Sequence, residues 1–123
     1  MAIAEKEYGN KHHLSNPANA FRHALWVILI IRKCLKWKNN EEKAIAWAKS
    51  FTDWHEDFSP NEPLDREMDL HNNQVGISFY EEVKNKNEEE IVLFLKQKAA
   101  KAKKIEAVDD VKSFQNQLIY IEE

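Results

Sequence analysis

Side chains capable of hydrolytic chemistry recur at helical spacing between residues 19 and 76. A histidine can act as a general base or nucleophile near neutral pH, and a neighbouring carboxylate can orient it. Arginine and carboxamide groups can stabilise negative charge that develops on a substrate. The residues of these types that we single out are Arg22, His23, His55, Glu56, Asp69, Asn72 and Asn73. Together they predict a hydrolytic active site.

Within this set we expect His55 to be the general base or nucleophile. Glu56 or Asp69 would orient or assist it, and His23 would be the second acid–base group. The two histidines and a carboxylate could instead be the three protein ligands of a catalytic zinc with an open fourth position. His55-Glu56 lacks a second histidine four residues after the first, so it is not the HExxH motif of metalloproteases. We therefore favour metal-free acid–base chemistry, and a divalent metal cofactor stays open.

The spacing of apolar residues between 41 and 58 predicts an amphipathic helix. Its expected inward face contains His55, with Glu56 at the edge of that face. The residues of the face, at steps of four, three, four and three, are Ala44, Ala48, Phe51, His55 and Phe58.

A second helical pattern follows between residues 65 and 84. Its inward stripe is Met68, Asn72, Val75, Phe79 and Val83. The neighbouring stripe is Asp69, Asn73, Gly76 and Tyr80. A glycine inside a helix costs about 1 kcal/mol relative to alanine. We therefore expect Gly76 to permit close approach of another backbone or of a ligand.

The helix predicted over residues 17–37 also carries polar groups on its inward side. Asn19, His23, Trp26 and Ile30 share one face, beside an apolar face that includes Phe21. A buried, unpaired polar group costs about 1–3 kcal/mol, and four or five would offset much of the ~5–15 kcal/mol stability of a small domain. These groups must therefore be satisfied by one another, by water, by a metal or by a ligand, and a single shared pocket is the simplest arrangement. A sealed, purely structural network is the alternative.

The patterns along the whole chain predict an all-α fold of four to five helices. The sequence has 2 Gly and 3 Pro, too few for a fold rich in turns. We expect helices over about 17–37, 41–57, 65–84 and 88–104, and the apolar end at 118–121 fits a short strand or a helical turn. Residues 1–123 would form a single compact domain, with the motif-bearing core at about 16–84 and a C-terminal helix and tail at 88–123.

Composition limits the classes of function. A net charge of −3 gives no overall attraction to nucleic acid, and the lysines at 96–104 are expected to be a solvated helix face. Cys34 is the single cysteine, so no internal disulfide can form. The longest apolar run, Ala24 to Ile31, is far shorter than the ~20 residues of a membrane span, and the first ten residues do not resemble a signal peptide. We expect a soluble protein without an integral membrane segment.

Three blocks of this sequence resemble a poorly characterised bacterial domain. They are NAFRHALW at residues 19–26, HE at 55–56 and MDLHNNQVG at 68–76. The resemblance covers about residues 16–80, with all three blocks in order. That domain often lies at the C-terminal end of long polymorphic secreted proteins of the Rhs and wall-associated types.

The resemblance implies a toxin or effector module delivered to competing cells without a cleavable signal peptide. Such modules are usually enzymes, travel with a secretion apparatus or carrier protein, and are paired with a cognate immunity protein. Block by block, the motif positions here are Arg22, His23, Trp26, His55, Glu56, Asp69, Asn72, Asn73 and Gly76. Of these, the substrate-binding group would be Arg22, Trp26, Asn72, Asn73 and Gly76.

We expect the substrate to be phospholipid or other cell-envelope material such as peptidoglycan, with nucleic acid second. The apolar, tryptophan-rich surroundings of the predicted site and the acidic net charge favour this order. The alternative is a non-enzymatic binding module, such as an immunity or adaptor protein, in which the polar cluster is structural.

Overall fold

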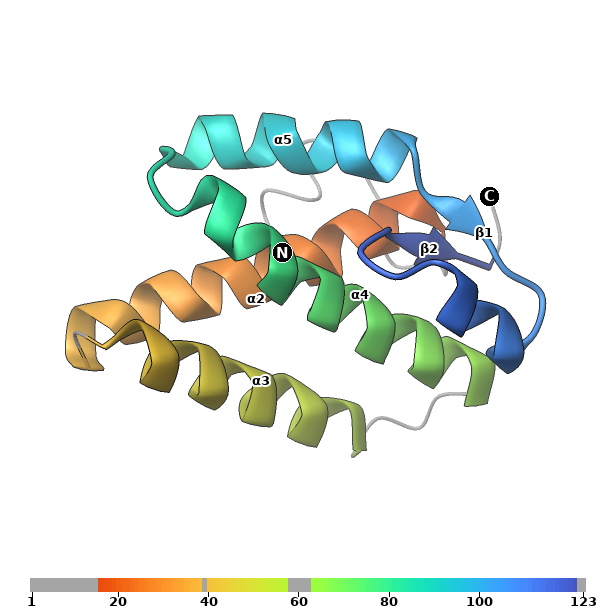
Figure 1. The fold of residues 1–123 in the computed structure, drawn as a ribbon, viewed down its shortest axis with the longest axis horizontal. Coiled ribbons are helices and arrows are strands. Elements are labelled where there is room, and N and C mark those ends of the chain that lie inside the picture. The colour runs from red at the N-terminus through yellow and green to blue at the C-terminus, as the bar shows by residue number, and fades with distance from the viewer. Residues whose placement is uncertain (1–15, 39, 58–62, 122–123) are drawn as a thin grey trace.

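The computed structural model describes residues 16–38, 40–57 and 63–121, and these confirm an all-α fold (Figure 1). The α-helices within these residues are α2 (Pro17–Lys38), α3 (Glu41–Asp57), α4 (Pro63–Val83) and α5 (Glu88–Ala100). A two-stranded parallel sheet follows, formed by β1 (Lys103–Lys104) and β2 (Ile119–Tyr120), with a short 3₁₀ helix (Val108–Ser113) between the strands. No described helix is long and apolar enough to cross a membrane.

Asparagine caps explain where three of the helices begin. The Oδ1 atom of Asn16 accepts a hydrogen bond from the backbone N–H of Asn19 at 3.0 Å, and Asn40 does the same for Lys43 at 3.0 Å. Asn87 forms a reciprocal capping box with Glu90 at the start of α5. Each cap satisfies an N–H group that the first helical turn leaves without a partner.

The expected end of the fourth helix, at about Lys104, is wrong because α5 ends at Ala100. Beyond it, the backbone N–H of Lys103 donates to Leu118 O and that of Ile105 donates to Tyr120 O, both at 2.9 Å. Strand pairing thereby buries the side chain of Ile105. The C-terminal apolar segment therefore forms a strand rather than a helical turn.

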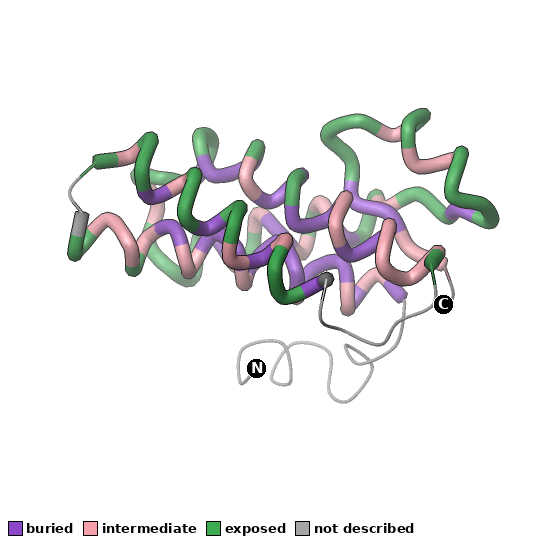
Figure 2. Tube along the Cα trace, turned by 90° about the horizontal axis from the view of Figure 1, so that it is seen from below, coloured by how far each residue is buried: buried purple, intermediate pink, exposed green. Residues whose placement is uncertain are grey.

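Helix α2 is the centre of the core. It packs against α3, α4, α5 and β2, and its side chains Phe21, Leu25, Ile28 and Ile31 are fully buried. Helices α3 and α5 lie on opposite sides of the α2–α4 pair (Figure 1). Seen along another direction, buried positions run through the interior while exposed positions follow the outer edges of the helices (Figure 2). A polar residue on the inner side of α2 therefore meets its neighbours on other helices.

Gly76 lies where α4 meets α2. A Cβ atom built at this position would lie 2.5 Å from Val27 Cγ1, 2.9 Å from the Ala24 Cα and 3.0 Å from the Ala24 carbonyl oxygen. Side-chain movement could relieve the first contact, but the backbone atoms of Ala24 belong to the central helix. The close approach expected at Gly76 is therefore to a second helix, which accounts for this glycine without a ligand.

We predict that Gly76→Ala destabilises the protein. Alanine improves helix propensity by about 1 kcal/mol, but forcing the helices apart costs about 1–3 kcal/mol, and the rigid backbone contact makes the second effect dominate. Denaturant titration should show a lower free energy of unfolding. Gln74→Ala, at an exposed position of the same helix, should leave it unchanged or higher. A Gly76→Ala protein more stable than the parent would contradict the packing argument.

Candidate functional site

Three helices bring one imidazole and two carboxyl groups together in the interior. His23 comes from α2, Glu56 from α3 and Asp69 from α4, and one potential ligand atom from each lies within 4.8 Å of the others. The Nε2 atom of His23 is 3.2 Å from Asp69 Oδ1, and its Nδ1 atom is 3.7 Å from Glu56 Oε1. We call His23, Glu56 and Asp69 the buried triad.

Asn73 links two members of the buried triad. Its Oδ1 atom lies 2.9 Å from His23 Nδ1, and its Nδ2 atom donates to Glu56 Oε1 at 3.4 Å. A carboxamide oxygen can only accept, so the Nδ1 atom of His23 carries the hydrogen of this bond. The contact holds the ring with Nε2 directed at Asp69. Asn73 thus lies in the predicted site, where it positions the imidazole.

Burial changes the protonation of the triad. Removal from water lowers the pKa of His23 from 6.5 to about 4, with the nearby Arg22 charge adding to this effect. Removal from water, together with the charge of Glu56, raises the pKa of Asp69 from 3.8 to about 8. Burial also raises the pKa of Glu56, with which Asp69 shares a hydrogen bond. At neutral pH, His23 is therefore uncharged and Asp69 retains its proton.

The structure corrects the expected inward face of α3. The buried residues follow steps of four, through Ala44, Ala48, Thr52 and Glu56. Such a row winds gradually around the helix axis, and it is the row that packs into the grooves of a crossing helix. The side chain of His55 is consequently 49% exposed and that of Glu56 only 1% exposed. Phe58, assigned to the same face, lies outside the described residues.

His55 therefore lies at the rim of the site rather than in its centre. Its Nδ1 atom is 3.8 Å from Glu56 Oε1, and its ring packs on Trp26 with centroids 5.0 Å apart. The Trp26 ring also makes an edge contact with His23 at 6.1 Å. Trp26 thus forms a wall between the buried imidazole and the exposed one.

Arg22 contributes positive charge beside the triad. Its guanidinium group lowers the pKa of both His23 and Asp69 through its electric field. Its Nε atom is buried and has no hydrogen-bond partner in the described part of the chain. Arg22 is thus placed close enough to the triad to act on charge there, as its residue type predicted.

The side chain of Asn72 bonds to the backbone of the C-terminal strand. Its Nδ2 atom donates to the carbonyl of Ile119 at 3.0 Å, and its Oδ1 atom accepts from the Ile119 N–H at 2.9 Å. The side chain thereby pairs with β2 as another strand would. Both of its side-chain polar atoms bond to the backbone of the C-terminal strand, so in this structure Asn72 attaches β2 to α4.

An aromatic groove, which the motifs did not predict, is formed by side chains of α2 and α3. It has a volume of about 520 Å³ and is lined by Trp26, Ile30, Lys33, Cys34, Trp37, Trp47 and Phe51. Trp37 is 82% exposed, and Trp47 stacks on Phe51 at 5.2 Å with the rings nearly parallel. The concentration of all four tryptophans between residues 26 and 54 was the sequence signal for this surface.

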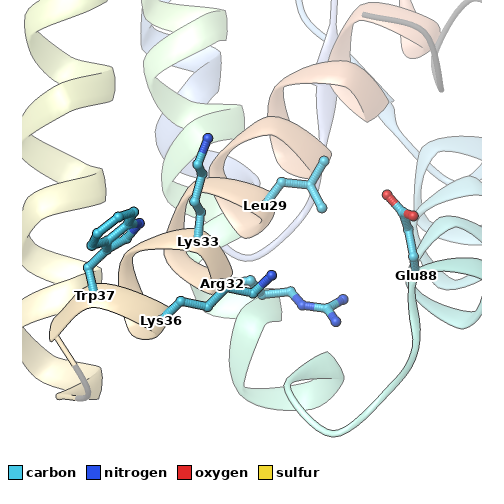
Figure 3. A pocket seen from close by; sticks show the side chains of 6 residues that line it. All are labelled: Leu29, Arg32, Lys33, Lys36, Trp37 and Glu88. Atoms are coloured by element: carbon cyan, nitrogen blue, oxygen red, sulfur yellow. The ribbon is translucent and has the colours of Figure 1, made fainter.

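A second pocket, of about 600 Å³, lies toward the C-terminal end of α2 and shares Lys33 and Trp37 with the aromatic groove (Figure 3). Arg32 and Lys36 also line it, and Glu88 lies across from them on α5. No Asp or Glu occurs between Pro17 and Lys38. This part of α2 therefore presents positive charge although the whole chain is acidic.

Comparison with known proteins places the chain in a family without assigning a function. The chain belongs to the family described as Domain of unknown function (DUF6973), whose sequence profile matches residues 1–103. No curated protein matches the chain. No solved structure matches it either.

We predict that Asn72→Ala releases the C-terminal strand. The change leaves the N–H and C=O groups of Ile119 buried without partners, and each such group costs about 1–3 kcal/mol. Hydrogen exchange at the Ile119 amide should accelerate more than exchange in α3. Asn72→Asp keeps the acceptor for the Ile119 N–H but sets a second oxygen against the Ile119 carbonyl, so it should also accelerate exchange. Asn85→Ala, at an exposed turn position, is the control; equal exchange in all variants would refute this role.

Proposed function

We propose that this protein is a hydrolase whose reaction centre is the buried triad. The observation that carries the proposal is the convergence of His23, Glu56 and Asp69 from three separate helices, with their reactive atoms within 4.8 Å. Burying two carboxyl groups and an imidazole in an apolar core costs stability. Clusters of this kind are frequent at functional sites, where the chemistry requires them. Asn73 supports the proposal because it orients the imidazole and bonds to Glu56.

The proposed reaction is the addition of water to an ester. The triad activates a water molecule, whose oxygen forms a bond to the acyl carbon. The ester C–O bond then breaks, and the proton removed from water is returned to the leaving alcohol. Arg22 stabilises the negative charge that develops on the carbonyl oxygen. His55, at the rim, contacts the substrate as it enters.

A phospholipid is the substrate class that the surface favours. Trp26 lines the aromatic groove and also contacts His23 of the triad, so the groove lies next to the proposed reaction centre. Apolar and aromatic walls suit an acyl chain, and exposed tryptophans favour the interface between membrane and water. The adjoining pocket contains Arg32, Lys33 and Lys36, whose positive charge would attract a phosphate headgroup. Peptidoglycan is the other cell-envelope candidate, and nucleic acid ranks behind both.

The biological role that we propose is antibacterial. The three sequence blocks and their order support an effector delivered into competing cells by a secretion apparatus or carrier protein. A cognate immunity protein would protect the producing cell. The aromatic groove is a surface that such a protein could cover to block the site.

We predict that His23→Gln abolishes toxicity in a bacterium that expresses the protein in its periplasm. Glutamine approximates the imidazole in size but cannot serve as base or nucleophile. Growth curves and circular dichroism should show loss of killing with the helical fold retained. His55→Gln should reduce killing less, because His55 lies at the rim. His71→Gln is the control, since His71 bonds only to the Gln117 carbonyl in the described structure. Full killing by folded His23→Gln would refute the assignment.

We predict that Trp47→Ala slows hydrolysis of phospholipid vesicles by at least about tenfold, the equivalent of ~1.4 kcal/mol. Hydrolysis of a short, soluble ester should change little, because its acyl group does not need the groove. Trp54→Ala is the matched control, since Trp54 is exposed on the same helix but does not line the groove. Equal losses on both substrates would argue against an acyl-chain groove.

A non-enzymatic binding module is the second candidate, and the depth of burial favours it. The side chains of His23, Glu56 and Asp69 are only 5%, 1% and 9% exposed. A structural hydrogen-bond network would be sealed in this way. In that case His23→Gln would lower stability without removing any hydrolytic activity, because the parent would have none.

A further inference from the structure

We propose that the buried triad is a divalent metal site of the zinc class, with His23 Nε2, a Glu56 oxygen and an Asp69 oxygen as protein ligands. The inference deepens the proposed function and rests on it only for the catalytic use of the metal. The site itself is inferred from the positions of the ligand atoms.

The spacing of the ligand atoms suits a transition-metal ion. Bonds of ~2.0–2.1 Å in tetrahedral geometry place neighbouring ligand atoms ~3.3 Å apart. His23 Nε2 and Asp69 Oδ1 are 3.2 Å apart. Glu56 is hydrogen-bonded to Asp69, so a carboxyl oxygen of Glu56 already lies next to the Asp69 carboxyl group. All three ligand atoms lie within 4.8 Å, and rotation of the Glu56 side chain can close the remaining gap.

The orientation of the imidazole also fits a metal ligand. Asn73 Oδ1 holds Nδ1 at 2.9 Å, which leaves Nε2 as the ring atom facing Asp69. Metal-bound histidines usually donate their other ring N–H to an oxygen acceptor, which fixes the ring and raises its basicity. Asn73 also bonds to Glu56 Oε1. One carboxamide thus positions two of the three proposed ligands.

Charge and burial point to a cation of this class. Two carboxylates balance the charge of a dication, and a single nitrogen ligand favours zinc-class ions over Mg²⁺ and Ca²⁺, which take oxygen ligands. The triad is buried between packed helices, unlike the exposed acidic clusters of many protein surfaces. Three protein ligands leave a fourth position for water, the arrangement of catalytic rather than structural zinc sites.

The test is zinc binding to the full-length apoprotein prepared with a chelator. The parent should carry His12→Gln and His13→Gln, which removes two imidazoles outside the described residues. Isothermal titration should show one Zn²⁺ per chain, and Co²⁺ should give the visible absorption of a tetrahedral site. His23→Gln and Asp69→Asn should weaken binding at least about 100-fold, and Asn73→Ala about 10–100-fold, as expected for a residue that positions a ligand. Circular dichroism should confirm that each variant is folded.

Asp53→Asn is the matched control because Asp53 lies on α3, where it pairs with Lys49 and not with the triad. It should bind zinc as the parent does. Lack of zinc binding by the folded parent, or unchanged binding in both His23→Gln and Asp69→Asn, would overturn the metal site. Hydrolysis by a metal-free parent would overturn the catalytic use of the metal and leave the proposed hydrolase intact. Zinc binding without hydrolysis would keep the metal site and overturn the proposed function.

Discussion

The contact of His23 with groups from two other helices is the interaction on which the rest of the structure depends. A side chain that is polar and almost fully buried must find partners, because an unpaired polar group in an apolar core is strongly unfavourable. His23 finds them in Asn73, Asp69 and Glu56. These contacts tie α2 to α3 and to α4 at one point of the interior. The polar site therefore favours this packing of the three helices over packings that would leave His23 without partners.

Close packing of α4 on α2 makes this arrangement possible. Gly76 lets the two helices approach until a side chain would meet the backbone of Ala24. Asn73 and Asp69, one and two turns before Gly76 on the same stripe, are thereby brought to His23. Asn72, one position round the helix, faces the other way and ties α4 to the C-terminal strand. One short segment thus serves helix packing, the site and the attachment of the sheet.

The buried triad and the nearby aromatic groove are connected by one side chain, that of Trp26. Trp26 contacts both the buried His23 and the exposed His55, and it also lines the aromatic groove. The groove borders a pocket with three basic side chains on α2. An amphiphile with an anionic headgroup would meet complementary groups in this groove and pocket. The proposed hydrolase and the proposed metal site both use the buried triad.

The sequence by itself determined the four helices and the inward stripes of α4, because apolar spacing and asparagine caps are local signals. It also indicated that His23, Asp69 and Asn73 face the interior. Only the tertiary structure decided that Glu56, rather than His55, completes the triad. Adjacent positions differ by ~100° around a helix, and the crossing of α2 and α3 selects which of them turns inward. The role of Asn72 depended on a strand 47 residues away in the chain. The end of α5 depended on pairing with the same strand, and local spacing cannot predict either contact.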